Sequence, residues 1–211
     1  MPTAARPASG RLPKNSSYHH GDLHRALLEA AIEELSGPEA HALSFRNLAR
    51  KLGVTTGAPY HHFKDRTELL VLIAAEGYER LSIEMSRAAA RTLSYKERVK
   101  GLTKAYLGFA RKQPGYYTAM FLPEVAAAGE VPELRAAAAK SFDLVCEVIA
   151  DHAPALSKGD VSERAVSLWS LLHGMLTLSA AGSLGRRLAK QREDKFAVDA
   201  VLRLLDGRPL C

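Results

Sequence analysis

Helix-forming residues constrain the fold of this chain more than any other feature of its sequence. Ala, Leu, Glu, Arg and Lys dominate, and no sustained run alternates β-branched or aromatic residues with polar ones, as a half-buried strand would. Prolines and glycines fall between apolar stretches of helical spacing. The sequence therefore predicts an all-α fold of about nine helices.

The length of 211 residues allows a small domain joined to a larger one, with a core that needs no disulfides. The cysteines, Cys146 and Cys211, form no closely spaced framework and have no metal-ligand spacing. Residues 1–17 lack the basic start and apolar run of a secretory leader. We therefore expect a cytoplasmic protein that holds neither metal nor cofactor.

Positive charge is concentrated at the start of the chain, whose formal net charge is +6. Residues 1–18 contain Arg6, Arg11 and Lys14 but no acid, and their Pro, Ala and Ser content predicts disorder. The segment is typical of a flexible basic arm, and the positive balance favours a polyanionic partner. For residues 1–10, a leader without function is the alternative.

One uncharged stretch, residues 165–185, has the length of a membrane span. It also carries serines, threonine, His173 and three glycines, and a lone helix in lipid would leave these polar groups unsatisfied. We expect a helix buried among other helices and no membrane partner.

Four helix starts are predicted in the first third of the chain. Asp22 is a candidate cap for a helix that ends at Leu35, and Ser44 for a short helix over 45–52 that Gly53 closes. Thr55 or Thr56 would cap a third helix reaching residue 63, and Pro59 must lie in its first turn because it lacks an amide proton. Asp65 would cap a fourth helix over 66–90, and further helices are expected at about 95–112, 115–121, 133–152, 160–184 and 193–205.

Residues 45–63 hold the pattern that points most directly to a function. A small residue, Ala49, precedes Gly53 by four positions, as a helix-turn-helix requires: Ala lets the second helix pack closely, and Gly allows the turn that directs it into the major groove of DNA. The second helix and its flanks carry hydroxyls, imidazoles and cations that suit phosphates and base edges. These residues are Thr55, Thr56, Gly57, Tyr60, His61, His62, Lys64 and Arg66.

Through Phe45–Phe63 and the following Lys64–Leu70, the chain resembles the TetR/AcrR-type transcriptional regulators. The resemblance extends over about residues 22–72. It implies an all-helical homodimer in which residues 19–66 form a three-helix domain that binds double-stranded DNA. Residues 67–211 would then form a helical domain that dimerises and binds a small-molecule effector. Pro59 stands where leucine is commonest in the family, which leaves the base preference open.

The resemblance also assigns DNA contacts to single residues. A base would be contacted by His61, bases or phosphates by Arg46, Thr55, Thr56 and the Gly57 amide, and phosphates by Tyr60, His62, Lys64 and Arg66. Phe63 is expected in the core, where it would lock the third helix to its neighbours. For each polar residue, an ordinary solvated surface is the alternative.

Two histidines, His20 and His24, lie four residues apart and could share a helical face as metal ligands. No cysteine lies nearby, Asp22 serves better as a cap, and histidines beside a basic arm suit phosphate equally well. We therefore expect no metal there, although what these histidines bind stays open.

The second domain carries one further resemblance and one small-residue stripe. Leu168–Gly174 looks like the Trp-His-Gly element in the C-terminal domain of one branch of the same family. Small residues on the same predicted helix would permit close approach of a second subunit, with residues 196–205 completing a four-helix bundle. The stripe is Ser170, Gly174, Thr177 and Ala181, and intramolecular packing is its alternative.

An apolar ligand cavity is expected near the breaks between the later helices, where aromatic residues and Met gather. The candidates are Tyr106, Phe109, Tyr116, Tyr117, Met120, Phe121, Phe142, Trp169 and His173. Aromatic residues at helical spacing are more often plain core, and a histidine on an apolar helix more often makes a hydrogen bond in the core. Both alternatives stay open here.

The function that these patterns predict is sequence-specific regulation of transcription. We expect a repressor that leaves a palindromic operator when a small, largely apolar ligand binds. A dimeric DNA-binding protein without an effector is the alternative. An enzyme is not expected, because the sequence has no nucleophile elbow, phosphate loop, dinucleotide fingerprint or zinc-protease motif. The sequence patterns do not specify the effector, the operator, the regulated genes or the sign of regulation.

Overall fold

The computed structural model describes residues 20–37, 42–90, 93–185, 188–189 and 192–206, so the expected basic arm at 1–18 lies outside the described residues. Within them the fold is all-α, as the sequence predicts, with nine α-helices, one four-residue 3-10 helix and no strand. The elements are α1 (His20–Leu35), α2 (Phe45–Leu52), η2 (Ala58–His61), α3 (Arg66–Ala88), α4 (Tyr95–Lys112), α5 (Pro114–Met120), α6 (Pro123–Ala127), α7 (Pro132–His152), α8 (Lys158–Ala180) and α9 (Glu193–Leu205).

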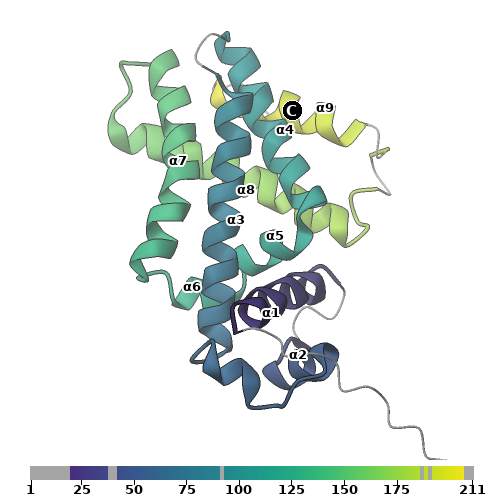
Figure 1. The fold of residues 1–211 in the computed structure, drawn as a ribbon. Coiled ribbons are helices and arrows are strands. Elements are labelled where there is room, and N and C mark those ends of the chain that lie inside the picture. The colour runs from purple at the N-terminus through teal and green to yellow at the C-terminus, as the bar shows by residue number, and fades with distance from the viewer. Residues whose placement is uncertain (1–19, 38–41, 91–92, 186–187, 190–191, 207–211) are drawn as a thin grey trace, which may run out of the picture.

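Helix α3 connects the two ends of the molecule (Figure 1). Helices α1 and α2 lie together at one end, beside the first turns of α3. The rest of α3 packs against α4, α5 and α7, and α8 and α9 pack beside α4. One continuous hydrophobic core runs from Leu27 in α1 to Val201 in α9. The N-terminal helices α1 and α2 therefore share their packing with the helices from α3 to α9, which we call the larger domain.

Side-chain caps set the ends of several helices, as expected. The Ser44 hydroxyl accepts a hydrogen bond from the Asn47 amide at 3.3 Å at the start of α2. Gly53 ends α2 in the left-handed region with φ of 68°, where a side chain would be strained. Asp65 caps α3 by accepting from the Glu68 amide at 2.9 Å. These three predicted caps are confirmed.

Other helix starts use capping boxes or proline. Ser94 with Glu97 and Ser157 with Asp160 form reciprocal capping boxes at α4 and α8. Helices α5, α6 and α7 begin at Pro114, Pro123 and Pro132, where the missing amide proton has no cost. The short α6 was not expected, because its five residues give no readable periodicity.

Two predicted N-terminal caps are wrong. Helix α1 begins at His20, so Asp22 lies inside its first turn, where an acidic residue is also favourable. The third helix is the 3-10 helix η2, with Gly57 at its cap position and no side-chain cap from Thr55 or Thr56. Three of its hydrogen bonds join residues three apart, as in a 3-10 helix: the amides of Ala58, Tyr60 and His62 donate to the carbonyls of Thr55, Gly57 and Pro59. Pro59 does lie in the first turn, as predicted.

The last long helices also differ slightly from the expectation. Helix α8 ends at Ala180 instead of Leu184, and Gly182 follows in the left-handed region with φ of 66°. Among the described helices, none combines the length and apolar character needed to cross a membrane.

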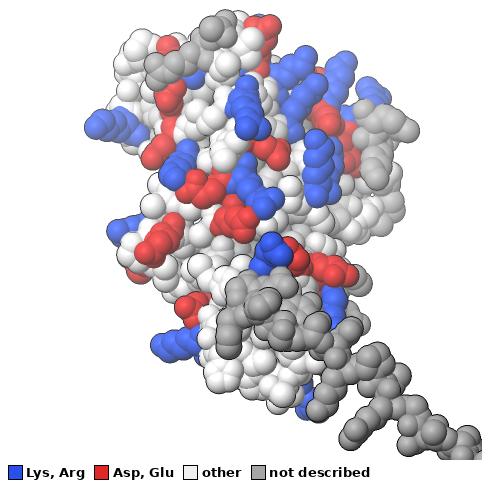
Figure 2. Space-filling view, in the orientation of Figure 1, with Lys and Arg blue, Asp and Glu red and all other residues white. Residues whose placement is uncertain are grey.

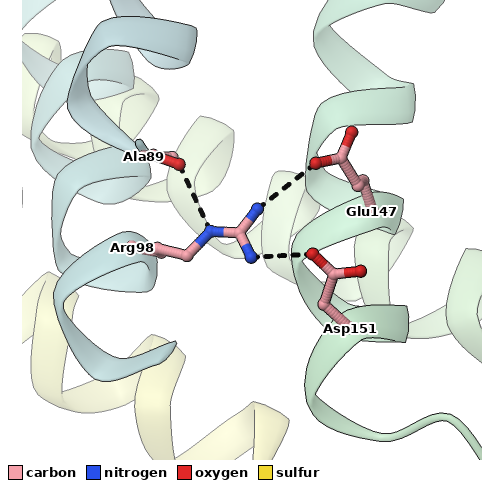
Figure 3. A network of polar contacts seen from close by, with 4 residues as sticks. All are labelled: Ala89, Arg98, Glu147 and Asp151. Atoms are coloured by element: carbon pink, nitrogen blue, oxygen red, sulfur yellow. Dashed lines mark hydrogen bonds and ion pairs between the residues drawn. The ribbon is translucent and has the colours of Figure 1, made fainter. Parts of the chain in front are cut away.

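A buried arginine ties α4 to its neighbours in the larger domain (Figure 3). The Arg98 side chain is 7% exposed, and its Nε donates to the Ala89 carbonyl at the end of α3, at 3.2 Å. Its terminal nitrogens pair with Asp151 at 2.9 Å and Glu147 at 3.4 Å, both on α7. One guanidinium on α4 thus connects the end of α3 with α7.

Candidate functional site

The predicted DNA contacts come from neighbouring elements at the end of the molecule that holds α2 and η2. Seven of the nine predicted residues are exposed: Arg46, Thr55, Thr56, Gly57, Tyr60, His61 and Lys64. We call these seven the helix-turn-helix face. They come from α2, from the turn after it, from η2 and from the segment before α3.

Packing beneath the helix-turn-helix face fixes its orientation. Leu48 and Ala49 on α2 are fully buried, and Phe63 is 2% exposed, which confirms its predicted place in the core. Tyr60 is 62% exposed, yet its ring edge rests on Phe45 with the ring centroids 5.0 Å apart. This ring contact stabilises the exposed position of the Tyr60 phenol, which would otherwise be unfavourable for a large aromatic side chain.

Gly57 is a glycine that the fold itself does not require. Its φ is −84°, an ordinary value for any residue, and an added Cβ would have no atom within 4 Å. At Gly53, four residues earlier, the positive φ favours glycine for a structural reason. The fold thus gives no structural reason of its own for glycine at this exposed position.

The other two predicted contacts lie differently. His62 is half-buried, with its ring 6.0 Å from that of His24, which in turn stacks on Phe63 at 4.7 Å. Arg66 points into the molecule: its side chain is 27% exposed, its Nε donates to the Leu43 carbonyl at 3.0 Å, and it pairs with Glu124 on α6. The structure therefore gives Arg66 an internal role that the sequence did not suggest, since Glu124 is 58 positions away.

Charge on the larger domain is mixed. Figure 2 shows Lys and Arg interspersed with Asp and Glu over the helices of that domain on the side in view. Ion pairs of the larger domain include Arg80 with Glu76 and Arg111 with Asp194. A surface of paired charges offers no single-sign field for a polyanion, so this side adds no second site for one.

Metal ligands do not gather in the described part of the chain, where no group of three His, Cys, Asp or Glu side chains could hold an ion. The side chain of His20 lies outside the described residues, so the pair with His24 is not tested. The stacking of His24 on Phe63 gives that residue a packing role.

A cavity of about 550 Å³ lies in the larger domain. Its wall comes from α3, α4, α7 and α8 and from the segment that contains α5 and α6. Five of the nine residues predicted for a ligand cavity line it: Tyr106, Met120, Phe121, Phe142 and Trp169. The others do not: Phe109 and Tyr116 are buried in the core, and Tyr117 and His173 lie outside the wall.

A chain of hydrogen bonds runs outward from the cavity wall. The Trp169 Nε1–H donates to the Tyr106 hydroxyl at 3.1 Å, the hydroxyls of Tyr106 and Tyr117 lie 3.3 Å apart, and that of Tyr117 lies 2.8 Å from His173 Nδ1. Burial raises the pKa of Tyr106 far above its ordinary value and the pKa of Tyr117 to about 12. Burial also lowers the pKa of His173, which favours a neutral imidazole beside the Tyr117 hydroxyl. His173 is thus a hydrogen-bonded residue behind the wall.

The small-residue stripe of α8 is exposed instead of packed inside the subunit. Ser170, Thr177 and Ala181 are exposed and Gly174 is half-buried, and an added Cβ at Gly174 would meet no atom within 4 Å. Large apolar side chains, each 40 to 49% exposed, lie on the same helix and on α9: Val166, Trp169, Leu178 and Phe196. An apolar, exposed surface of this kind is typical of a subunit interface.

Comparisons with known proteins agree with this arrangement. The family model described as "Bacterial regulatory proteins, tetR family" matches residues 27–73, which hold the helix-turn-helix face. The model described as "Tetracyclin repressor-like, C-terminal domain" matches residues 99–203, which hold much of the cavity wall and the exposed stripe. These families and the curated relatives below are regulators, in line with the expectation that the chain is not an enzyme.

Among curated relatives, the HTH-type transcriptional regulator Rv1816 of Mycobacterium tuberculosis is 31% identical over 104 residues, which are 46% of this chain and 44% of that protein. The chain thus matches less than half the length of that relative. Its Mycobacterium bovis counterpart, Mb1846, matches equally.

Among solved structures, a protein of unknown function from Rhodococcus sp. RHA1 is 30% identical, with a TM-score of 0.70 over 92% of this chain and 99% of that one. The TetR family regulator PfmR from Thermus thermophilus is 20% identical and shares the fold, with a TM-score of 0.58 over 86% of this chain and 97% of its own. Both domain models and these relatives agree, and the chain therefore belongs to the TetR family of bacterial regulatory proteins.

Proposed function

We propose that the protein is a sequence-specific DNA-binding regulator of transcription in the cytoplasm, acting as a homodimeric repressor that a small, largely apolar ligand releases from a palindromic operator. The observation that carries the proposal is the helix-turn-helix face. Its polar and cationic side chains are exposed, while the apolar side chains of the same elements form a buried core.

Each chemical group on the helix-turn-helix face has a counterpart on duplex DNA. Lys64 and the hydroxyls of Thr55, Thr56 and Tyr60 suit phosphate oxygens, and Arg46 and His61 suit phosphates or base edges. Gly57 would let the backbone approach the sugar-phosphate chain closely, which accounts for a glycine that the fold does not need. We propose that His62 contacts phosphate from its half-buried place and that Arg66 orients the face from inside.

Dimerisation would place two such faces on one side of the DNA. The exposed stripe on α8, with the apolar side chains of α8 and α9, supports a two-fold interface in which these helices and their mates form a four-helix bundle. Two recognition elements near one helical turn apart, about 34–36 Å, would then read the two half-sites of a palindrome. The Trp169, His173 and Gly174 element leads us to propose the Trp-His-Gly branch of the family.

Ligand response is supported by elements that the cavity and the helix-turn-helix face share. Helix α3 lines the cavity through Tyr78, Leu81 and Met85, and it starts at Arg66 directly after the face. The cavity also touches α6, where Glu124 holds Arg66. A ligand that changes the position of α3 or α6 would therefore change the separation of the two faces and shift the population away from the DNA-binding state.

Selection from a random duplex pool tests this function. The expected result is a palindromic motif that the protein binds about 10³-fold or more tightly than scrambled duplex at physiological salt. Compounds that release the selected duplex would then identify the effector. Binding without sequence preference would contradict the proposal and would leave a dimeric DNA-binding protein without an effector as the better description.

A further inference from the structure

The cavity wall restricts the chemistry of its ligand, because its hydrogen-bond donors are almost all in use. The wall is mainly hydrocarbon. Its side chains with polar hydrogens are Tyr78, Tyr106, Arg135, Ser141 and Trp169. Whether a ligand can accept a hydrogen bond inside the cavity depends on these five.

Three of the five donate to the protein itself. The Tyr78 hydroxyl donates to the Met120 carbonyl at 3.4 Å, and the Ser141 hydroxyl donates to the Ala138 carbonyl at 3.0 Å. The indole N–H of Trp169 donates to the Tyr106 hydroxyl at 3.1 Å. An indole N–H can only donate, so the Tyr106 oxygen is the acceptor in this bond.

Tyr106 is committed as well. Its oxygen accepts from Trp169, and its hydroxyl lies 3.3 Å from the Tyr117 hydroxyl, which in turn lies 2.8 Å from Nδ1 of His173. A protein acceptor is therefore within reach of the Tyr106 hydrogen. The chain ends on an imidazole that burial keeps neutral, and a neutral ring nitrogen can accept. The single polar hydrogen of Tyr106 thus has a protein acceptor within reach, as those of Tyr78, Ser141 and Trp169 have.

Arg135 differs from the other four. It lies in the first turns of α7 and lines the cavity with a side chain that is 67% exposed, which places its guanidinium at the mouth. The carboxylate of its partner, Glu130, is 3.5 Å away on a side chain that is 95% exposed, and such a solvated pair is weak and readily exchanged. A ligand anion can therefore take the place of Glu130.

We propose that the ligand is an amphipathic carboxylate, an inference that rests on the proposed effector cavity. Its apolar chain would fill the interior, and Arg135 would hold its single anionic headgroup at the mouth. At about 30 Å³ for each water-sized group, the cavity holds on the order of 18 non-hydrogen atoms. A carbonyl or hydroxyl placed in the interior would have to compete with these protein partners for a side-chain donor. One acceptor left unsatisfied lowers affinity by about 5- to 150-fold.

The only tryptophan of the chain, Trp169, lies in the wall and reports binding through its fluorescence. We would titrate the full chain with sodium dodecanoate, with 1-dodecanol and with methyl dodecanoate, each below its micelle or solubility limit. Dodecanoate is expected to bind about 1.4- to 5-fold more tightly than the two uncharged compounds, the range of a charge contact near solvent. Arg135→Gln should remove that difference and leave 1-dodecanol binding unchanged.

The matched control is Arg87→Gln, which removes the same charge from an exposed position on α3 outside the cavity wall. It should retain the preference for dodecanoate. Equal affinities for the three compounds, or an Arg135→Gln variant that still prefers dodecanoate, would overturn the inference about the headgroup. Absence of any change in Trp169 fluorescence would overturn the ligand class altogether.

Duplex selection on the same preparation separates this inference from the proposed function. Sequence-specific DNA binding without a preference for dodecanoate defeats the ligand class and leaves the regulator. A preference for dodecanoate that depends on Arg135, in a protein that binds no specific duplex, supports the ligand class and defeats the regulator.

Discussion

Replacement of Arg66 by alanine tests whether this residue positions the helix-turn-helix face or contacts DNA. The Nε–H bond to the Leu43 carbonyl has a charged donor and is partly buried, which corresponds to about 1.5–3 kcal/mol. The ion pair adds less than about 1 kcal/mol, because Arg66 is 27% and Glu124 41% exposed to screening solvent. We expect Arg66→Ala to lower the free energy of unfolding by about 2–3 kcal/mol and the Tm by roughly 4–12 °C.

Glu124→Gln is the matched variant, because it removes the charge of the partner and leaves the bond to Leu43 in place. It should cost less than about 1 kcal/mol. Urea unfolding of both single variants and of the double variant gives a double-mutant cycle. The coupling energy between Arg66 and Glu124 from this cycle should also stay below about 1 kcal/mol.

The salt dependence of duplex binding then separates the two roles of Arg66. If Arg66 is internal, its replacement leaves the slope of log K against log salt unchanged, whereas Lys64→Ala should reduce that slope by about 0.9 per protomer. A stable Arg66→Ala protein whose slope falls as far as that of Lys64→Ala would refute the internal role and restore Arg66 as a phosphate contact.

Three other perturbations have defined outcomes. Gly57→Ala should raise stability slightly, by up to about 1 kcal/mol in thermal unfolding, yet weaken binding of the selected duplex about tenfold or more, whereas Gly53→Ala, at a φ of 68°, should destabilise the fold. Arg98→Met should cost about 2–3 kcal/mol in urea unfolding, below the value for a fully buried pair because both carboxylates reach solvent. Since burial lowers the pKa of His173, the unfolded chain binds its proton first, so stability should fall as the pH drops below about 6.5 and should fall less in His173→Asn. Unchanged duplex affinity in Gly57→Ala, unchanged stability in Arg98→Met, or equal pH profiles for the two His173 forms would each contradict the corresponding assignment.

Local chemistry made much of the fold predictable. Ser44, Gly53 and Asp65 mark helix ends through hydrogen bonds that reach only a few residues along the chain, and such signals are readable in a sequence. The same reasoning misjudged Asp22, because an acidic residue is stabilising both at a cap and in the first turn. It misjudged the cap at Thr55 or Thr56, because the third element is a 3-10 helix that begins at Ala58 with Gly57 at its cap position.

Long-range packing was the part that could not be predicted. Helical spacing indicates which side of α4 faces inward, but it does not separate core residues from cavity residues on that side. Phe109 packs in the core, whereas Tyr106 lines the cavity. The ion pair between Arg66 and Glu124 joins two positions that share no local pattern. Only the arrangement of α3 beside α6 brings them together.

The role of the helix-turn-helix face is tested most directly by fluorescence anisotropy with the selected duplex and a scrambled one. The variant is Tyr60→Phe with His61→Ala, which keeps the ring contact with Phe45 and removes only exposed polar groups. We predict unchanged thermal unfolding and a fall of at least about tenfold in affinity for the selected duplex, with Lys195→Ala, an exposed change on α9, as the control. An affinity for the selected duplex within about twofold of the unaltered protein would contradict the assignment of this face to DNA.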